Sequence, residues 1–224
     1  MLKLKSCKTY GFSLSEVLIT LTIVGVVAIL VIPGLMKDMT DKSRMAMLHN
    51  IVSNANNVVQ NEIIQKRAQG LNETDIVKDP LQFLKNFDYS NTDDCFAPEY
   101  SGVQDGTYSH HSSIMQAQVL LKNGLCIGIA KENGMDSRIL AIDVNGKQDP
   151  NKVGIDYFEL KIEASTDTSK GIHVGDVGAF SIEELGDNNI TEVKKECLTV
   201  NEYTARSCYL LVEDSGFDTN YLGN

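Results

Sequence analysis

The sequence has few basic residues and lacks the short motifs of common catalytic sites. It contains 20 Lys and Arg against 30 Asp and Glu, which gives a formal net charge of -10, and no basic stripe is present. Because affinity for nucleic acid comes mainly from clustered Lys and Arg, this composition excludes a nucleic-acid-binding protein. The sequences G-x-S-x-G, H-E-x-x-H, G-x-G-x-x-G and the P-loop are also absent. We therefore do not expect an enzyme.

Other absences restrict the domain organisation. The chain shows no internal repeat, no low-complexity tract and no linker that would separate a second independent domain. It also has no C-x-x-C pair, which argues against a structural zinc site. Its 224 residues are 42% apolar, close to the globular norm, so a disordered chain is excluded. This length suits one ordinary domain together with a separate long element.

The N-terminal segment combines a basic start with a long apolar run. Lys3, Lys5 and Lys8 lie in the first eleven residues, which contain no acid, and Val17 to Met36 carry no charge. Twenty apolar residues at about 1.5 Å each span a bilayer core of about 30 Å. Basic residues before an apolar segment normally stay in the cytoplasm, so the chain after Met36 is expected to be exported. No A-x-A cleavage site follows the apolar run, unlike an ordinary signal peptide.

One acid, Glu16, interrupts the apolar segment. An ionised carboxylate inside hydrocarbon costs several kcal/mol unless it is paired. Nothing basic lies within a helical turn on its C-terminal side, so a suitable cation would be a new α-amino group on Phe12, created by cleavage after Gly11. In a staggered helical bundle, the N-terminus of a neighbouring chain could reach Glu16. The lone acid therefore indicates an assembly function.

The residues around this acid match a known signal. The segment resembles the class III signal of type IV pilins and type II secretion pseudopilins, with the sequence Gly11-Phe12-Ser13-Leu14-Ser15-Glu16-Val17-Leu18. The resemblance implies that a prepilin peptidase cleaves after Gly11 and methylates the amine of Phe12. It also implies that Glu16 neutralises the amine of an adjacent subunit. Ser13 and Ser15 depart from the commonest pattern, which has Thr and an aliphatic residue.

The same resemblance implies a location and a set of partners. The protein would cross the bacterial inner membrane once, export its C-terminal domain, and then join related subunits in a helical pilus or pseudopilus. Extraction from the membrane would require an inner-membrane platform protein and an assembly ATPase. A surface pilus and a secretion pseudopilus are both compatible with the sequence. The alternative is a signal-anchored exported domain, ligand-binding or enzymatic, that does not polymerise.

Apolar periodicity predicts an α+β chain, and the resemblance implies that its architecture is the pilin fold. Residues 1–11 form the leader, and a long helix over 12–69 has a membrane part (12–36) and an amphipathic part (37–69). Apolar residues at Met45, Leu48, Val52, Ala55 and Val59 mark the buried face of the second part. Pro33 and Gly34 should bend or open the helix.

The globular part, residues 70–224, is predicted to form a small antiparallel meander of three or four strands. Strand-like runs separated by turn signals occur at Ile114 to Leu121, Leu125 to Ala130, Arg138 to Asp143 and Tyr157 to Ile162. Short helices are predicted at Pro80 to Phe87 and Thr204 to Glu213. The meander is expected to pack on the amphipathic half of the long helix.

One loop concentrates oxygen-bearing side chains, namely Asp143, Asn145, Asp149, Asn151 and Asp156. Calcium prefers six to eight oxygen ligands, which a turning loop can bring together. Lys147 stands at the third ligand position of an EF-hand and no glutamate stands at the twelfth, so that motif is rejected. Major pseudopilins carry a calcium loop in this part of the fold. Calcium is the one cofactor that the sequence suggests. The alternative is a purely structural turn built from Asx and glycine residues.

The cysteines are placed as expected for an exported domain. Cys7 lies in the leader, and an even number lie in the exported part: Cys95, Cys126, Cys197 and Cys208. Four cysteines allow three pairings. A bridge between Cys197 and Cys208 would stabilise by roughly 3 kcal/mol in the loop-entropy description, and many type IV pilins close a C-terminal loop in this way. We favour this pairing, which leaves Cys95 with Cys126.

Overall fold

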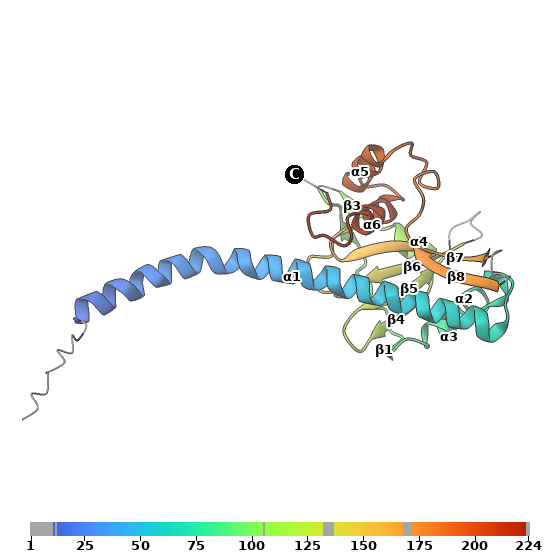
Figure 1. Cartoon of the computed structure of the whole chain (residues 1–224), viewed down its shortest axis with the longest axis horizontal. Coiled ribbons are helices and arrows are strands. Elements are labelled where there is room, and N and C mark those ends of the chain that lie inside the picture. Colours follow the sequence, from blue (N-terminus) through green and yellow to red (C-terminus); the bar gives the residue numbers. More distant parts are fainter. Residues whose placement is uncertain (1–10, 12, 105, 132–136, 168–171, 223–224) are drawn as a thin grey trace, which may run out of the picture. The chain divides into compact units, whose positions relative to one another are not determined.

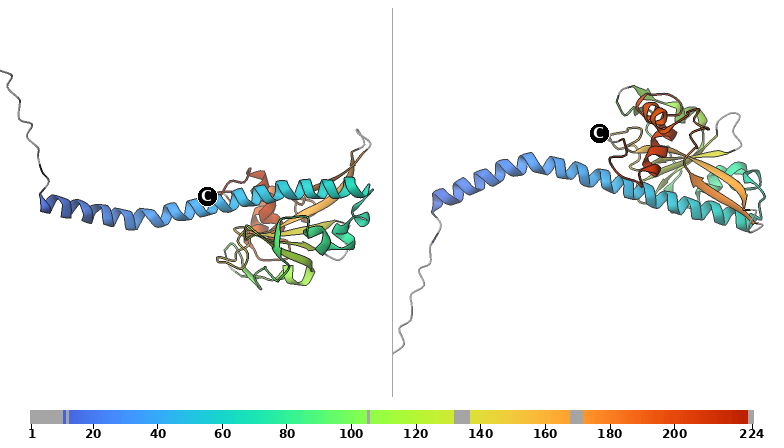
Figure 2. Two further views of the ribbon diagram at one scale, coloured as in Figure 1. Left: turned by 90° about the horizontal axis from the view of Figure 1, so that it is seen from below. Right: turned by 45° about the horizontal axis from the view of Figure 1, so that its top comes forward.

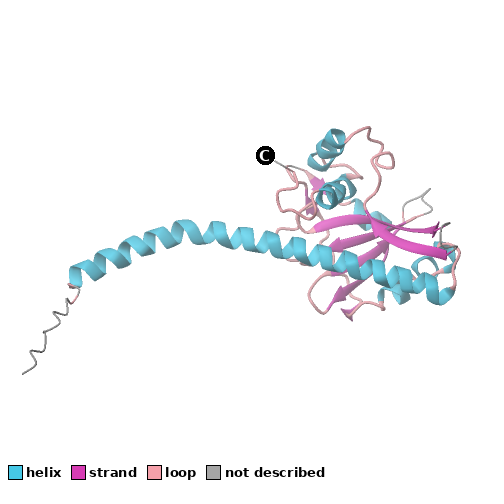
Figure 3. Ribbon diagram, in the orientation of Figure 1, coloured by secondary structure: helices cyan, strands magenta, loops and turns pink. Residues whose placement is uncertain are grey.

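The computed structural model describes residues 11, 13–104, 106–131, 137–167 and 172–222. The chain divides into two compact units, Met1–Thr40 and Asp41–Asn224. Its fold is α+β: a long N-terminal apolar helix, whose later turns pack on an antiparallel sheet (Figure 3). This is the predicted fold class.

Helix α1 runs from Leu14 to Lys66 and belongs to both units. In the first unit it stays helical through Pro33, although proline cannot donate the usual backbone hydrogen bond. The ribbon curves in this unit without a break (Figure 1), so the expected bend is present and a local opening is not. The helix ends where Arg67 adopts a left-handed conformation, with φ of 51°.

In the second unit, α1 buries the face that its apolar periodicity predicts. Met45, Leu48, Val52, Ala55 and Val59 are each at most 6% exposed. Figure 2 shows this part of the helix lying along the sheet. The apolar stripe is therefore a core-forming face of the molecule, as expected from its spacing.

The sheet is larger than the predicted meander. It has six strands in the order β1-β4-β5-β6-β7-β8, and all neighbours are antiparallel. The strands are β1 (Tyr89–Asn91), β4 (Met115–Leu121), β5 (Cys126–Ala130), β6 (Arg138–Asp143), β7 (Tyr157–Asp167) and β8 (Ile172–Gly178). The expected meander is β4 to β7. The prediction missed β1 and β8, and β7 extends beyond its predicted end at Ile162.

Both faces of the central strands are buried. In β6, Leu140 and Ile142 face a core shared with α1, which we call the helix-side core. Ile139 and Ala141 face a second cluster, the far-side core, built with residues from α5 (Ile190–Leu198) and α6 (Thr204–Asp214). Side chains of a strand alternate between faces, so burial on both sides explains why β5 and the middle of β6, Ile139 to Ile142, lack charged and polar side chains.

Short elements complete the second unit. A 3₁₀ turn, η1 (Leu71–Glu73), leads into α2 (Asp75–Lys78) and α3 (Pro80–Leu84), so the helix predicted at Pro80 to Phe87 is shorter than expected. Helix α4 (His110–Ile114) precedes β4, and a small hairpin pairs β2 (Tyr100–Ser101) with β3 (Thr107–Tyr108). Helix α6 starts at the predicted residue and ends one residue later than predicted.

Candidate functional site

The start of α1 is organised around Glu16. The Ser13 backbone N–H donates to Glu16 Oε2 at 2.7 Å, and the Ser13 hydroxyl donates to the same oxygen at 2.8 Å. In return, the Glu16 backbone N–H donates to Ser13 Oγ at 3.2 Å. This reciprocal arrangement is a capping box, which satisfies backbone donors at a helix N-terminus. Within one chain, Ser13 therefore partners the carboxylate that interrupts the apolar segment.

The predicted cleavage site lies directly before this box. Gly11 is exposed, and Phe12, the predicted new N-terminus, lies outside the described residues. Glu16 is the fifth residue after the predicted cleavage point and lies in the first turn of α1. The cleavage, the methylation and the pairing of Glu16 with another subunit stay predictions.

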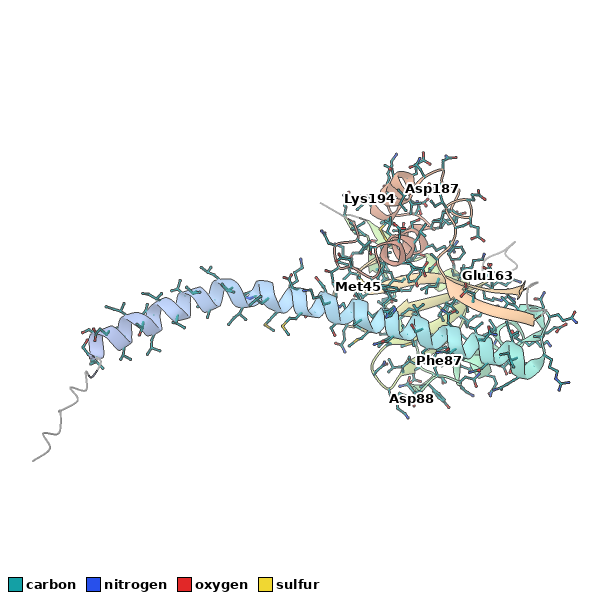
Figure 4. The ribbon with its side chains drawn as sticks, in the orientation of Figure 1. Met45, Phe87, Asp88, Glu163, Asp187 and Lys194 are labelled. Atoms are coloured by element: carbon teal, nitrogen blue, oxygen red, sulfur yellow. A yellow bond between two sulfur atoms is a disulfide. The ribbon has the colours of Figure 1, made fainter. Side chains whose placement is uncertain are left out.

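The part of α1 that follows the box presents an apolar surface. Among the described residues, α1 is long and apolar enough to cross a membrane by its length and composition. Its large apolar side chains are exposed in the single chain, for example Leu21 at 67% and Leu30 at 76% (Figure 4). The polar hydroxyls of Thr20 and Thr22 donate to helix carbonyls, at 2.9 Å to Glu16 O and 2.8 Å to Leu18 O. This segment thus has the features of a membrane anchor.

The second unit contains the two favoured disulfides. Cys95 is bonded to Cys126, and Cys197 is bonded to Cys208, with sequence separations of 31 and 11. The first ties the segment before β2 to strand β5, and the second joins α5 to α6. The predicted pairing is confirmed.

The proposed calcium loop is a tightly hydrogen-bonded turn between β6 and β7. Asp143 is fully buried, and its carboxylate accepts from the Tyr100 hydroxyl at 2.6 Å and from Asn145 N at 3.1 Å. Asn145 Nδ2 donates to Gln148 O at 2.7 Å. Asp149 accepts from Asn151 Nδ2 at 3.3 Å. Two of the five expected ligands, Asp143 and Asp149, therefore already accept hydrogen bonds from other groups of the chain.

The other three expected ligands each hold an oxygen without a hydrogen-bond partner. These buried atoms are Asn145 Oδ1, Asn151 Oδ1 and Asp156 Oδ2. Burial raises the pKa of Asp156 and the Asn145 side chain lowers it in part, so the two side chains lie together. Carboxylate and amide oxygens fit calcium. The described residues contain no group of three or more His, Cys, Asp or Glu that could hold a metal, so amide and carbonyl oxygens would have to complete such a site.

The electrostatics of the loop are dominated by burial. Burial raises the pKa of Asp143 to about 7, although the hydrogen bond from Tyr100 opposes the shift. Burial likewise raises the pKa of Asp156 to about 6, opposed by the Lys152 backbone N–H and by the charge of Arg44. Arg44 also donates to Asp149 O at 3.5 Å. Arg44 of α1 therefore contacts the loop, and its positive charge would compete with that of a bound metal ion.

The sequence analysis did not predict a buried ion pair that lies on the far-side core's face of the sheet. Arg206 Nε lies 3.0 Å from Glu159 Oε2, and both side chains are 0% exposed. Glu159 also accepts from the hydroxyls of Tyr108 at 2.6 Å and Tyr157 at 2.8 Å. The guanidinium lies 5.1 Å from the ring centroid of Phe180. Glu159 alternates with apolar residues in β7, a pattern that normally indicates an exposed strand face and so gives no signal of burial.

Comparison with known proteins agrees with the N-terminal geometry. Residues 7–32 match the family described as the prokaryotic N-terminal methylation motif. No curated protein and no solved structure gave a significant match. The matched residues include the predicted cleavage site, the Ser13–Glu16 capping box and most of the apolar segment. By its N-terminal motif the chain resembles type IV pilin-like prepilins, a resemblance that points to a structural subunit rather than an enzyme.

Proposed function

We propose that this protein is a structural subunit of a type IV pilus-like filament or a type II secretion pseudopilus. Prepilin peptidase cleaves it after Gly11 and methylates the amine of Phe12. Until assembly, the apolar part of α1 anchors it in the inner membrane, with the second unit exported. The observation that supports this proposal best is the methylation motif, coupled to an apolar helix that carries a single acid at its start.

Assembly then proceeds through the helices. In the filament, Glu16 pairs with the α-amino group of a neighbouring subunit, which fixes the register of the packed helices. Moving the apolar helix from lipid to a filament core gains little hydrophobic free energy, because the helix is out of water in both places. The process therefore requires a platform protein and an assembly ATPase.

The first test is the mass of the N-terminal peptide of the protein isolated from its native host. Cleavage after Gly11 with one methyl group on Phe12 is the expected result. A chain that retains Lys3, Lys5 and Lys8 would overturn the proposal and favour a simple membrane anchor for an exported domain.

The pairing step is tested separately. Glu16→Ala should leave cleavage intact and strongly reduce filament formation, measured by shearing and by microscopy. Glu183→Ala removes an exposed acid from the exported unit and should assemble normally. If Glu16→Ala formed filaments at the normal level, the pairing would be wrong even though the chain is processed.

Gene neighbourhood distinguishes the two kinds of filament. A retraction ATPase encoded nearby would favour a surface pilus. A cluster linked to a secretin for protein secretion would favour a pseudopilus.

We further propose that the loop between β6 and β7 binds calcium through Asn145, Asn151 and Asp156. The three buried oxygens without partners support this proposal. Because a ligand that binds only the folded state stabilises it, millimolar calcium should raise the melting temperature of the full-length protein in detergent. Magnesium, which demands stricter geometry, should have a smaller effect.

Two matched variants test the ligand assignment. Asp156→Asn should abolish the calcium-dependent shift, whereas Asp149→Asn should retain most of it, since the Asp149 carboxylate already accepts a hydrogen bond from Asn151. If calcium did not raise the melting temperature of the unaltered protein, the loop would not be a calcium site. Equal losses in the two variants would overturn the assignment of Asp156.

A further inference from the structure

Arg138, the first residue of β6, is a buried cation with only 5% of its surface exposed. Leu140, two residues later in the strand, and Ile162, its cross-strand partner on β7, both belong to the helix-side core. Alternate residues of a strand face the same side, so Arg138 also faces that apolar side of the sheet. A charge removed from water in this way is costly unless an opposite charge lies beside it.

The guanidinium of Arg138 has no such partner in the part of the chain that the structure describes. Nη1 donates to the backbone carbonyl of Ser137 at 3.2 Å, while Nε is buried and has no hydrogen-bond partner. Burial lowers the pKa of Arg138, and no neighbouring carboxylate among these residues opposes that shift. The positive charge is therefore buried without a counter-charge from the described residues.

The unused donors of Arg138 form one edge of the guanidinium. The N–H groups of Nε and Nη2 point the same way on this planar group, and such an edge pairs with two oxygens of one anion. Nη2 makes no hydrogen bond with the described residues, and it is not among the buried atoms without a partner. One end of the edge is therefore open to solvent, so that an anion can reach the buried Nε from outside.

A carboxylate fits this edge better than a phosphate group does. Its single negative charge equals the positive charge of Arg138, so the pair would be neutral on the apolar face that Arg138 shares with Leu140 and Ile162. A phosphate monoester carries about -1.5 to -2 charges at pH 7 and would leave an excess negative charge there. The planar carboxylate also matches the guanidinium with two parallel hydrogen bonds.

We propose that Arg138 binds a carboxylate that comes from outside the chain, through the edge formed by Nε and Nη2. The ligand class is a free organic monocarboxylate. A carboxylate presented by a second copy of the chain has the same chemistry, and the experiment distinguishes the two sources. This inference does not rest on the proposed function, because it concerns the folded second unit whether or not the leader is cleaved.

Acetate is the probe for the first test, on the full-length protein in detergent. Sodium acetate, compared with sodium chloride at the same pH and ionic strength, should raise the melting temperature in a saturable way. At ten times its dissociation constant, a ligand that binds only the folded state shifts the folding equilibrium about elevenfold, which raises the melting temperature by about 3–6 °C for a unit of this size. Phosphate should have a smaller effect at equal concentration.

Variants of the cation test the assignment. Arg138→Met should abolish the acetate response, whereas Lys131→Met, which removes an exposed cation directly after β5, should retain it. In chloride alone, Arg138→Met should raise the melting temperature, because it replaces an unpaired buried charge with an apolar side chain. A lower melting temperature would mean that the charge is already paired within the chain, and the inference would be wrong. Arg138→Lys keeps the charge without the two-donor edge, so an acetate response equal to that of the unaltered chain would also contradict the proposal.

Two further comparisons identify where the carboxylate comes from. Glu132→Gln/Asp136→Asn neutralises the two acids that precede Arg138 most closely in the sequence and lie outside the described residues. The acetate response should be present in the unaltered chain and persist in this variant. If the unaltered chain gave no response, or this variant alone gave one, the inference would be overturned. A melting temperature in chloride that rises with protein concentration, and only when Arg138 is present, would identify a second copy as the source, and independence of concentration would identify a free acid.

Discussion

At the scale of single residues, the most constrained side chains are the buried charges of Glu159 and Arg206. Each is fully buried, and the pair is surrounded by the hydroxyls of Tyr108 and Tyr157 and by the ring of Phe180. Such a pair contributes little net stability compared with apolar residues, yet removing one partner leaves an uncompensated buried charge. The pair therefore makes the far-side core intolerant of single substitutions.

Glu159→Ala is expected to destabilise the protein by about 3–5 kcal/mol, because the charge of Arg206 would remain buried without its partner. Glu163, on the same strand, forms an ion pair with Lys161 with its own side chain 46% exposed. Glu163→Ala should cost only about 0–1 kcal/mol. Urea unfolding of both variants measures the difference. Similar losses would show that the burial of Glu159 is not what makes it important.

Residue-level prediction succeeded where local chemistry was decisive. The cysteine pairing was favoured among three possible pairings, with support from the resemblance to type IV pilins, and is confirmed. The motif at Gly11 to Leu18 was identified from its fixed order of features. The capping of Glu16 by Ser13 was missed, although the S-x-x-E spacing is its sequence signature. Glu159 could not be assigned to a buried pair, because its partner Arg206 lies 47 residues away in the sequence.

At the scale of elements, the contact of α1 with β8 depends on a glycine. Gly175 allows Val59 and Ile63 to approach the strand backbone, and Gln60 Oε1 on the same helix then accepts a hydrogen bond from Gly175 N at 2.9 Å. Any side chain at this position would push the helix away from the strand. The contact is thus limited by steric fit as well as by hydrogen bonding.

Gly175→Ala is expected to destabilise the second unit by about 1–3 kcal/mol, since an added methyl group overpacks the contact. Gly178→Ala is the matched control, because its nearest neighbour would be Glu213 Oε1 at 3.6 Å, an ordinary contact. Thermal unfolding of the two variants gives the comparison. An unchanged melting temperature for Gly175→Ala would mean that the helix can shift freely on the strand.

Element prediction was best for strands buried on both faces. β5 and β6 were found because their apolar runs are continuous, and the buried face of α1 was found from its period. β8 was missed because its sequence, Ile172-His-Val-Gly-Asp-Val-Gly178, contains two glycines and one acid, and its edge is completed by helices that are distant in sequence. Helix α5 was also missed, since its nine residues make only about two and a half turns, too few for an apolar period to stand out.

At the scale of the whole molecule, the buried tyrosines set a response to alkaline pH. Burial raises the pKa of Tyr100, Tyr157 and Tyr209 above the ordinary value of 10.0. A raised pKa in the folded state stabilises the protein below pH 10, and that stabilisation is lost as the pH rises further.

We expect these three tyrosines to stay neutral in the folded protein above pH 10 and to ionise together when alkali unfolds it. Phenolate absorbance should therefore rise in two stages, first for exposed tyrosines and then cooperatively with the loss of circular dichroism. A single smooth titration of all tyrosines before unfolding would contradict the burial of these side chains.

The two disulfides make one side of the second unit sensitive to oxidation. All four of their cysteines lie in the far-side core, and none of the buried residues that form the helix-side core is a cysteine. The packing of α1 on the sheet therefore involves no covalent link, whereas the far-side core gains two, one joining α5 to α6 and one joining the segment before β2 to β5, only where thiols are oxidised. The redox state of the compartment thus sets the stability of the far side of the sheet and leaves the helix side unaffected.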